Sequence, residues 1–309
     1  MNAPPILDAL ARVERLLFET PVLESFIARR EAGESGSEDI ETADALALEL
    51  IAHQSDNGSW GDSLALTAES LLLLADLQPL NEDLSAAVGR AIAWLRSRQR
   101  APGAFAQNCS PARHEIGLCI HRATGFYSPG PASVAFHSVP LANGALFPSD
   151  DDARLALSAL ALRALLRFDA PRTDDRLQLH ALSAAADAMF RDSSPVSAAA
   201  GIFVLDALIE SRVEEATIGN SLSRLVGLQR ADGTWGSADT FHVADTLLFA
   251  HSRGYELPAL SRALTRTAEM LALSQHADGT WGNASGTFRL LVGWRILRHA
   301  GAYAVKVPA

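Results

Sequence analysis

The sequence predicts an all-α protein built from helical hairpins, and two observations carry this prediction. The pattern Gln-x-x-Asp/Asn-Gly-x-Trp-Gly occurs three times, at residues 54–61, 229–236 and 275–282. Between the copies, apolar residues recur at the i, i+3, i+4 and i+7 spacing of amphipathic helices, and Ala and Leu dominate. Such self-similarity is typical of repeat proteins, in which each unit buries its apolar face against its neighbours.

The spacing of the copies predicts six repeats. A weaker copy at residues 99–105 has Phe105 in the Trp place, so the copies start 45 (99−54), 130 (229−99) and 46 (275−229) residues apart. The long gap is about three periods, and degenerate copies fit at 140–146 and near 184–190. Six hairpins suit closure into an (α/α)6 barrel, a toroid of inner and outer helices. An open HEAT-like solenoid is the alternative.

We therefore expect one domain over residues 1–309, with N-terminal helices over 1–45, six repeats over about 46–300 and a short, loose C-terminal tail from Gly301. Each repeat contributes two helices, and breakers such as Gln78-Pro79 separate them. The Asp-Gly of each motif predicts a tight turn, because Gly adopts positive φ freely. The Trp that follows is expected to pack into the seam between neighbouring hairpins.

Composition narrows the range of functions. Hydrophobic residues make up 48% of the chain, which is ample for a core, and the net charge of −10 argues against a nucleic-acid partner. Two cysteines give no disulfide framework, which favours a cytoplasmic protein. We see no basic and apolar secretory leader, and no apolar run approaches the ~20 residues of a membrane span.

The repeated motif resembles the QW motif of the terpenoid cyclase and protein prenyltransferase superfamily, especially squalene–hopene cyclase and bacterial class II terpene cyclases. The resemblance extends over nearly the whole chain and implies an (α/α)6 barrel with the active site in its central cavity. A fold hosts many chemistries, so function has to be argued from the site.

An acidic segment, Ser149-Asp150-Asp151-Asp152-Ala153, resembles the D-x-D-D-T-A motif of class II cyclases. In that alignment Pro148 stands at the first Asp, Asp150 at the central one and Asp152 at the Thr. The central Asp is the proton donor of that family, so the resemblance implies that Asp150 is a general acid with Asp151 and Asp152 beside it. Protonating an alkene or epoxide needs a protonated carboxylic acid, and burial and neighbouring carboxylates both raise an Asp pKa.

The same residues have a purely structural interpretation. Ser149 is a good N-cap, and Asp residues are common in the first turn of a helix, whose positive end stabilises their charge. This effect lowers an Asp pKa and opposes the catalytic role.

Further candidates come from the register of the repeat. Thirteen residues after the motif Gln, or its counterpart Pro140, the chain should start an inner helix, and these positions should circle one opening. We expect His242 to be catalytic, returning the proton or bonding to the acid. A capping or solvent-facing His is the alternative. The substrate-binding candidates are Glu69, Phe147, Phe241, Asp245 and Arg289.

No metal or cofactor is expected, although a diphosphate substrate could bring Mg²⁺ with it. Cys109, His114, Cys119 and His121 are of metal-ligand type, but their spacing matches no zinc motif. The expected partner is a small isoprenoid or polyene, without nucleic acid or a transmembrane segment, and a homodimer or partner subunit is compatible with a lone barrel.

The leading hypothesis is a class II-type cyclase or isomerase that protonates an isoprenoid. The rivals are a non-catalytic barrel that binds a lipid or a partner, and another natural-product enzyme that reuses the barrel. Aromatic residues are only 6% of the chain, which is low for a cavity that stabilises carbocations by cation–π contacts.

Overall fold

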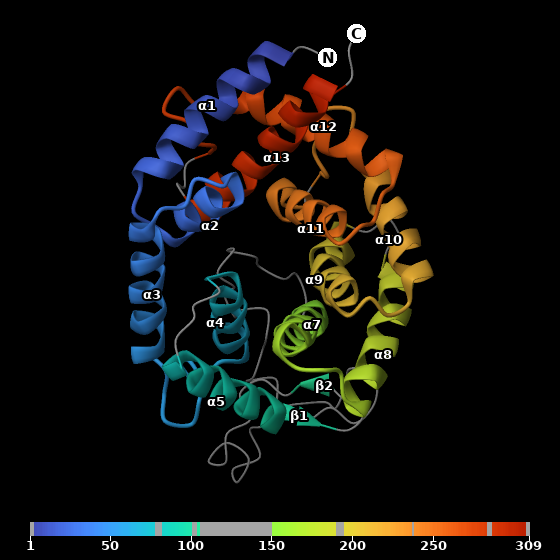
Figure 1. Ribbon diagram of the computed structural model, residues 1–309. Coiled ribbons are helices and arrows are strands. Elements are labelled where there is room, and N and C mark those ends of the chain that lie inside the picture. The colour runs from blue at the N-terminus through green and yellow to red at the C-terminus, as the bar shows by residue number, and fades with distance from the viewer. Residues whose placement is uncertain are drawn as a thin grey trace. The chain divides into compact units, whose positions relative to one another are not determined.

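The computed structural model describes residues 3–77, 82–100, 104–105, 150–189, 195–236, 238–282 and 286–306. In chain order the elements are α1 (Ala3–Glu19), α2 (Leu23–Ala32), α3 (Ser37–Ala52), α4 (Leu64–Leu77), α5 (Glu82–Arg98), β1 (Gln99–Arg100), β2 (Ala104–Phe105), α7 (Asp150–Phe168), α8 (Thr173–Met189), α9 (Pro195–Ser211), α10 (Glu215–Gly227), α11 (Thr240–Ser252), α12 (Pro258–Ser274) and α13 (Thr287–Lys306) (Figure 1). Within these residues, the only strands are the two-residue β1 and β2, so the predicted all-α class is confirmed.

The helices form two compact units. Unit 1 comprises Met1–Ala43 and Leu222–Ala309, and unit 2 comprises Asp44–Ser221. In unit 2, α7 packs between α4 and α9, and α5 and α8 pack against these helices. In unit 1, α13 packs between α2 and α11, and α1 and α12 pack against α13. The closure of the repeats into one barrel stays a prediction.

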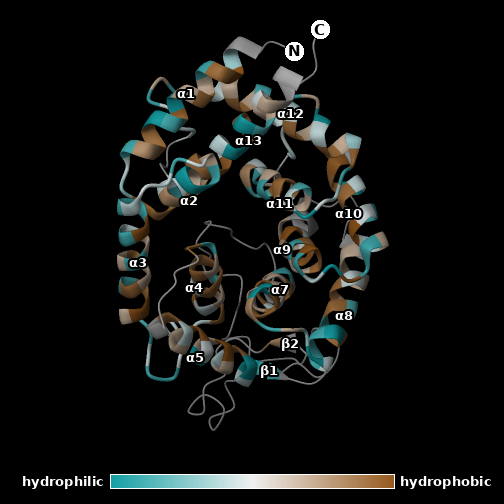
Figure 2. Ribbon diagram, viewed as in Figure 1, coloured by the Kyte–Doolittle hydropathy of each residue, from teal (hydrophilic) through white to brown (hydrophobic). Residues whose placement is uncertain are grey.

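Ion pairs show that the central helices of unit 2 run parallel. Arg167, near the end of α7, pairs with Asp76 near the end of α4 at 3.5 Å and with Glu210 near the end of α9 at 3.4 Å. All three C-terminal ends therefore meet. Figure 2 shows α9 apolar over most of its length, whereas α12 alternates between polar and apolar residues. A helix that is apolar on all its faces is stable only where it is buried on all sides. The central position of α9 in unit 2 provides such burial.

The three Trp residues of the repeated motif occupy equivalent places, as predicted. Trp60, Trp235 and Trp281 are 5%, 6% and 4% exposed. Each indole Nε1 donates a hydrogen bond to the carbonyl of the Leu ten residues earlier, over 2.8, 2.8 and 2.9 Å respectively. The motif Trp therefore links its turn to the end of the preceding helix. The hydrogen bond also satisfies the buried indole N–H.

The motif Gln binds each turn to a neighbouring helix. Gln54 Nε2 donates to the carbonyl of Gly58 in its own turn and to that of Ala87 on α5. Gln229 repeats the pattern on α12, with the carbonyls of Gly233 and Ala263. The acidic or amide side chain of the motif accepts bonds from the backbone N–H and hydroxyl of the Ser or Thr two residues later, which closes the turn.

The motif Gly lies against the backbone of that neighbouring helix. Gly58 has φ 89°, and a Cβ placed there would lie 2.4 Å from the carbonyl oxygen of Arg90 on α5. We expect Gly58→Ala to destabilise the fold more than Gly254→Ala, whose φ is 91° and whose Cβ would meet nothing within 4 Å. Each substitution is expected to lower the free energy of unfolding by about 1–2 kcal/mol, because Ala is strained at positive φ. Gly58→Ala should lower it by about 1–3 kcal/mol more, because the added Cβ overpacks against α5.

Unfolding in urea measures the two free energies, because Gly254→Ala isolates the backbone strain. Equal losses for the two variants would show that the close approach of α5 to the turn contributes nothing.

The last copy of the motif binds the first helix of the chain. Gln275 Nε2 donates to the carbonyl of Ala9 on α1 over 3.2 Å, and Arg12 Nε donates to Gln275 Oε1 over 2.9 Å. In unit 1, α1 thus takes the position that α5 and α12 hold beside the earlier copies. This role of the N-terminal helix was not predicted from the sequence.

Three details correct the expectations from sequence. Residues 184–189 lie inside α8, so no motif turn forms there. Residues 301–306 belong to α13 and are not a loose tail, since an Ala-containing run continues the helix. In the weaker copy, Gln99 Nε2 donates to the Asp175 carboxylate, a side-chain acceptor on α8, while Phe105 is buried like the Trp it replaces. The degenerate copy at 140–146 lies outside the described residues.

Candidate active site

The acidic segment opens a central helix of unit 2. The backbone of Asp150 and Asp151 forms the first residues of α7, and Asp152 follows with a half-buried side chain. The helix start predicted at this segment is therefore confirmed. Phe147 lies outside the described residues, as do the four Cys and His residues of the preceding segment. A helix N-terminus stabilises negative charge, which opposes the protonated state that an acid catalyst in this segment needs.

Glu69 lies in the same unit, on α4, which packs directly against α7. Its side chain is half-buried. Asp76 follows seven residues later, which is almost two helical turns, so both carboxylates lie on one face of α4.

The other four predicted residues come together in unit 1. Phe241, His242 and Asp245 lie on α11, and Arg289 lies on α13, which packs beside α11. Arg289 pairs with Asp239, the N-cap of α11, at 3.2 Å and lies 5.4 Å above the Phe241 ring. Arg289 therefore takes part in an ion pair at the start of α11.

His242 is held among aromatic and charged neighbours. Its ring centroid lies 5.0 Å from that of Phe288. Burial lowers the pKa of His242 below its ordinary value of 6.5, while Asp239 and Asp245 oppose the shift. The imidazole is therefore neutral at neutral pH, which is the state that can accept a proton, and the two carboxylates would stabilise the imidazolium once formed.

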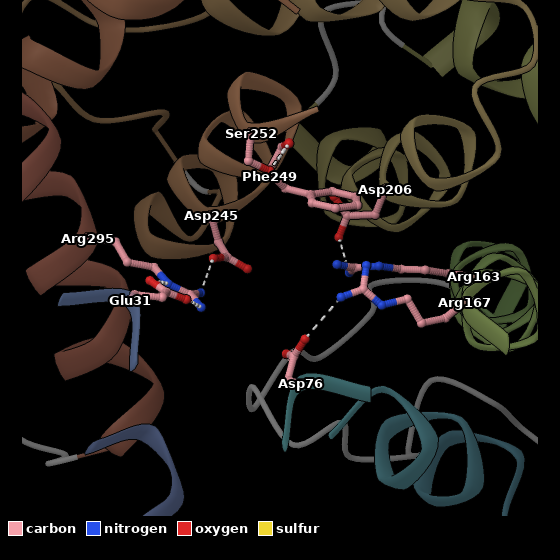
Figure 3. Close-up of polar contacts among 9 residues, drawn as sticks. All are labelled: Glu31, Asp76, Arg163, Arg167, Asp206, Asp245, Phe249, Ser252 and Arg295. Atoms are coloured by element: carbon pink, nitrogen blue, oxygen red, sulfur yellow. Dashed lines mark hydrogen bonds and ion pairs between the residues drawn. The ribbon is translucent and has the colours of Figure 1, made fainter. Parts of the chain in front are cut away.

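Asp245 takes part in an ion-pair network that the sequence analysis missed. Arg295, six residues beyond Arg289 on α13, pairs with Asp245 at 3.3 Å and with Glu31 of α2. In Figure 3 the side chains of Asp245 and Glu31 both point toward the Arg295 guanidinium. Asp245 is thus held in place by a fixed cation.

A second network in unit 2 was also missed. We call it the charged cluster, and it consists of Asp76, Arg163, Arg167, Asp206 and Glu210. Arg163 of α7 pairs with Asp206 of α9 at 2.6 Å, and Arg167 pairs with Glu210 and Asp76. Figure 3 shows the Arg163 and Arg167 side chains extending from α7 toward their acidic partners.

A signal for this cluster was present in the sequence. Arg163 and Arg167 interrupt an apolar helix at i and i+4, and Asp206 and Glu210 do the same in the next apolar helix. Charged residues are almost never buried unless they are paired, so two such interruptions of opposite sign predict a contact.

Eight of the nine predicted residues lie in the described part of the chain, and they fall into one group in each unit. Glu69 and Asp150–Asp152 belong to unit 2, and Phe241, His242, Asp245 and Arg289 belong to unit 1. Their arrangement around a single opening stays a prediction. In the part of the chain that the structure describes, no helix has the length and apolarity to cross a membrane.

Comparison with known structures identifies the fold. The chain is similar to the type II terpene cyclase MstE from Scytonema in complex with merosterolic acid A, its product, with a TM-score of 0.56, 13% identity and coverage of 97% of this chain and 98% of that one. It is also similar to MstE in complex with its substrate, geranylgeranyl dihydroxybenzoate, with a TM-score of 0.55, 12% identity and the same coverage. The chain is similar to apo MstE with a TM-score of 0.54 and 12% identity, and the match covers 98% of this chain and 99% of that one.

This chain therefore has the terpenoid cyclase fold, and the resemblance first seen in the repeated motif is confirmed at the level of the fold. No protein-family model and no curated protein sequence matches it.

Proposed function

We propose that this protein is a class II-type isoprenoid cyclase, an isomerase that starts its reaction by protonating an alkene or epoxide. Asp150 is the general acid, and Asp151 and Asp152 are its neighbours. The observation that carries the proposal is the position of this acidic segment, which opens a central helix of a fold similar to type II terpene cyclases over 97% of the chain.

The reaction needs one group that donates a proton at the start and another that accepts a proton at the end. The acid must stay protonated near neutral pH, and adjacent carboxylates favour this because two like charges in one place cannot both ionise readily. The final carbocation must lose a proton to a base. We assign this step to His242, because burial keeps its imidazole neutral.

The remaining parts of the proposal follow from the same chemistry. A carboxylic acid supplies the initiating proton, so no cofactor is needed, and Mg²⁺ would enter only with a diphosphate substrate. Glu69, Phe241, Asp245 and Arg289, together with Phe147, are the proposed substrate-binding residues. MstE was solved with a geranylgeranyl compound bound, which supports an isoprenoid as the substrate class. The low cysteine content favours a cytoplasmic enzyme.

The test is product analysis. The purified chain is incubated with linear polyprenyl compounds that differ in chain length and polar end, and the products are identified by mass spectrometry. A cyclic product with the same mass as its substrate supports the proposal. Products that have shed their polar end would indicate ionisation chemistry instead, and the absence of any conversion would favour a binding protein.

A further inference from the structure

We infer that Asp239 and Arg289 are a positioning pair for His242: they fix the imidazole at the start of α11, and neither of them exchanges the proton. The inference rests on the proposed function, because it concerns the base of that reaction. In the last step of the reaction the carbon beside the cation gives a proton to the imidazole, and the electrons of the broken C–H bond form the double bond of the product. Arg289 has this role in addition to the substrate contact proposed above.

The two oxygens of the Asp239 carboxylate make different contacts. Oδ1 accepts a hydrogen bond from the backbone N–H of Phe241 over 2.9 Å and so caps α11. Oδ2 accepts a hydrogen bond from Nη2 of Arg289 on α13 over 3.2 Å. One side chain therefore fixes the first turn of α11, which contains His242, and links that turn to the start of α13.

The Arg289 guanidinium has two further neighbours. It lies 5.4 Å from the centre of the Phe241 ring. Its Nη1 lies against the last glycine of the third motif copy, because a Cβ placed on Gly282 would be 3.3 Å from that atom. The motif turn and the first turns of α11 and α13 therefore meet at one guanidinium.

His242 lies beside this ion pair and depends on the same two helices. Its ring centroid is 5.0 Å from that of Phe288, the residue that precedes Arg289 on α13. The ring contact and the ion pair are thus two neighbouring links between the starts of α11 and α13. Because the ion pair holds the two starts together, it also holds the imidazole against its aromatic neighbour.

The pair also acts on the charge of the imidazole. Burial lowers the pKa of His242, Asp239 and Asp245 raise it, and Arg289 lowers it. The two members of the pair therefore act on His242 in opposite directions. Arg289 helps to keep the imidazole neutral before proton transfer, and Asp239 stabilises the imidazolium afterwards.

Other charged groups lie on the helices around α11. On α13, Arg295 pairs with Asp245 and with Glu31 of α2. On α12, which also packs against α11, the buried residues are apolar apart from Thr267. The charged residues of α12 lie outside this buried set: Arg262, Arg266 and Glu269. Within the described part of the chain, the charges that act on the pKa of His242 are those of Asp239, Asp245 and Arg289.

The experiment measures the titration of His242 by NMR of the carbon-bound ring protons in protein with labelled histidine. His242→Gln identifies the signal by its absence. Arg289→Gln removes the positive charge and keeps much of the apolar stem, and Asp239→Asn removes the negative charge and keeps a good N-cap. Arg289→Lys retains the charge. The Arg289 and Asp239 side chains are 39% and 33% exposed, so the fold should tolerate each change.

Two variants elsewhere in unit 1 are matched controls. Arg298→Gln removes a positive charge from the same helix, and Arg298 also lies over an aromatic ring, 5.0 Å from the centre of Trp294. Asp278→Asn removes a carboxylate whose Oδ1 also accepts a backbone N–H two residues later, that of Thr280, over 3.0 Å. Neither charge acts on the pKa of His242, so both variants should leave its titration unchanged.

We expect the pKa of His242 to rise in Arg289→Gln, to fall in Asp239→Asn and to stay close to that of the wild-type chain in Arg289→Lys. Both charge-removing variants break the same ion pair, so a purely structural role would not give shifts of opposite sign. Shifts of the same sign, or shifts no larger than those of the two controls, would overturn the inference. A shift in Arg289→Lys as large as that in Arg289→Gln would also overturn it, because the charge would then not be the cause.

Catalysis gives a separate result with the same variants. A base that works in its neutral form makes kcat/KM rise with pH through the pKa of His242 in the free enzyme. This rise should move to higher pH in Arg289→Gln and to lower pH in Asp239→Asn. Cyclisation with an unmoved pH profile would overturn the inference and leave the cyclase intact. Opposite shifts by NMR without conversion of any polyprenyl compound would overturn the cyclase and leave the action of the pair on the imidazole intact.

Discussion

Replacing Asp150 with Asn is expected to reduce turnover by at least about 100-fold, the low end for the loss of a general acid. An amide at this position cannot deliver the proton that starts the proposed reaction. The fold should be nearly unaffected, because Asn also serves well at the start of a helix. The comparison is kcat/KM of the variant and the wild-type chain, together with their melting temperatures.

Asp152→Asn is the matched variant on the same helix turn. We expect it to reduce kcat/KM less, because the class II motif that this segment resembles has a neutral Thr at the corresponding place. A fully active Asp150→Asn variant would remove Asp150 from the mechanism. A larger loss in Asp152→Asn than in Asp150→Asn would transfer the role of acid to Asp152.

Trp235→Ala is expected to lower the free energy of unfolding by about 3–5 kcal/mol, the usual cost of deleting a large buried aromatic side chain. The side chain is only 6% exposed, and its removal also leaves the Leu225 carbonyl without its indole partner. Urea unfolding monitored by circular dichroism measures the loss.

Trp235→Phe separates these two contributions. It keeps most of the apolar volume and loses only the hydrogen bond, so about 1–2 kcal/mol of the total loss is expected from that bond. An unchanged melting temperature in Trp235→Ala would mean that the repeated motif does not hold the fold together.

The repeated motif made the fold predictable because each of its residues has a physical task. Gln54, Gly58 and Trp60 reach the backbone of neighbouring helices or allow its close approach, and such contacts tolerate few other residue types. Sequence self-similarity therefore reports directly on packing. The weaker copy at Gln99 lacks the Asp and the Trp, and its contacts differ accordingly.

The position of α1 could not be predicted in this way. Gln275 bonds to Ala9 across more than 260 residues of chain, and nothing in the residues of α1 repeats the motif. The Ala9 carbonyl is a backbone group, which every sequence carries, so it leaves no signature in the sequence. The side-chain signal in α1 is a single residue, Arg12, which donates to Gln275 as Arg90 and Arg266 donate to the motif Gln of the other two copies.

His242 became a candidate because the register of the repeat places it thirteen residues after Gln229, at the start of an inner helix. In the structure it lies in the first turn of α11, and its ring lies beside that of Phe288 at the start of α13. The charged cluster was missed because its members lie in the second half of their helices. The register of the turn points only to the residues that begin each helix.

The most direct measurement of the central claim is deuterium incorporation. The chain is incubated with an accepted polyprenyl substrate in D₂O, and the cyclic product is examined by mass spectrometry and NMR. Protonation by a carboxylic acid that exchanges with solvent predicts one deuterium bound to carbon at the end of the chain where cyclisation starts, with the polar end retained. A cyclic product without carbon-bound deuterium, or one that has lost its polar end, would contradict the account.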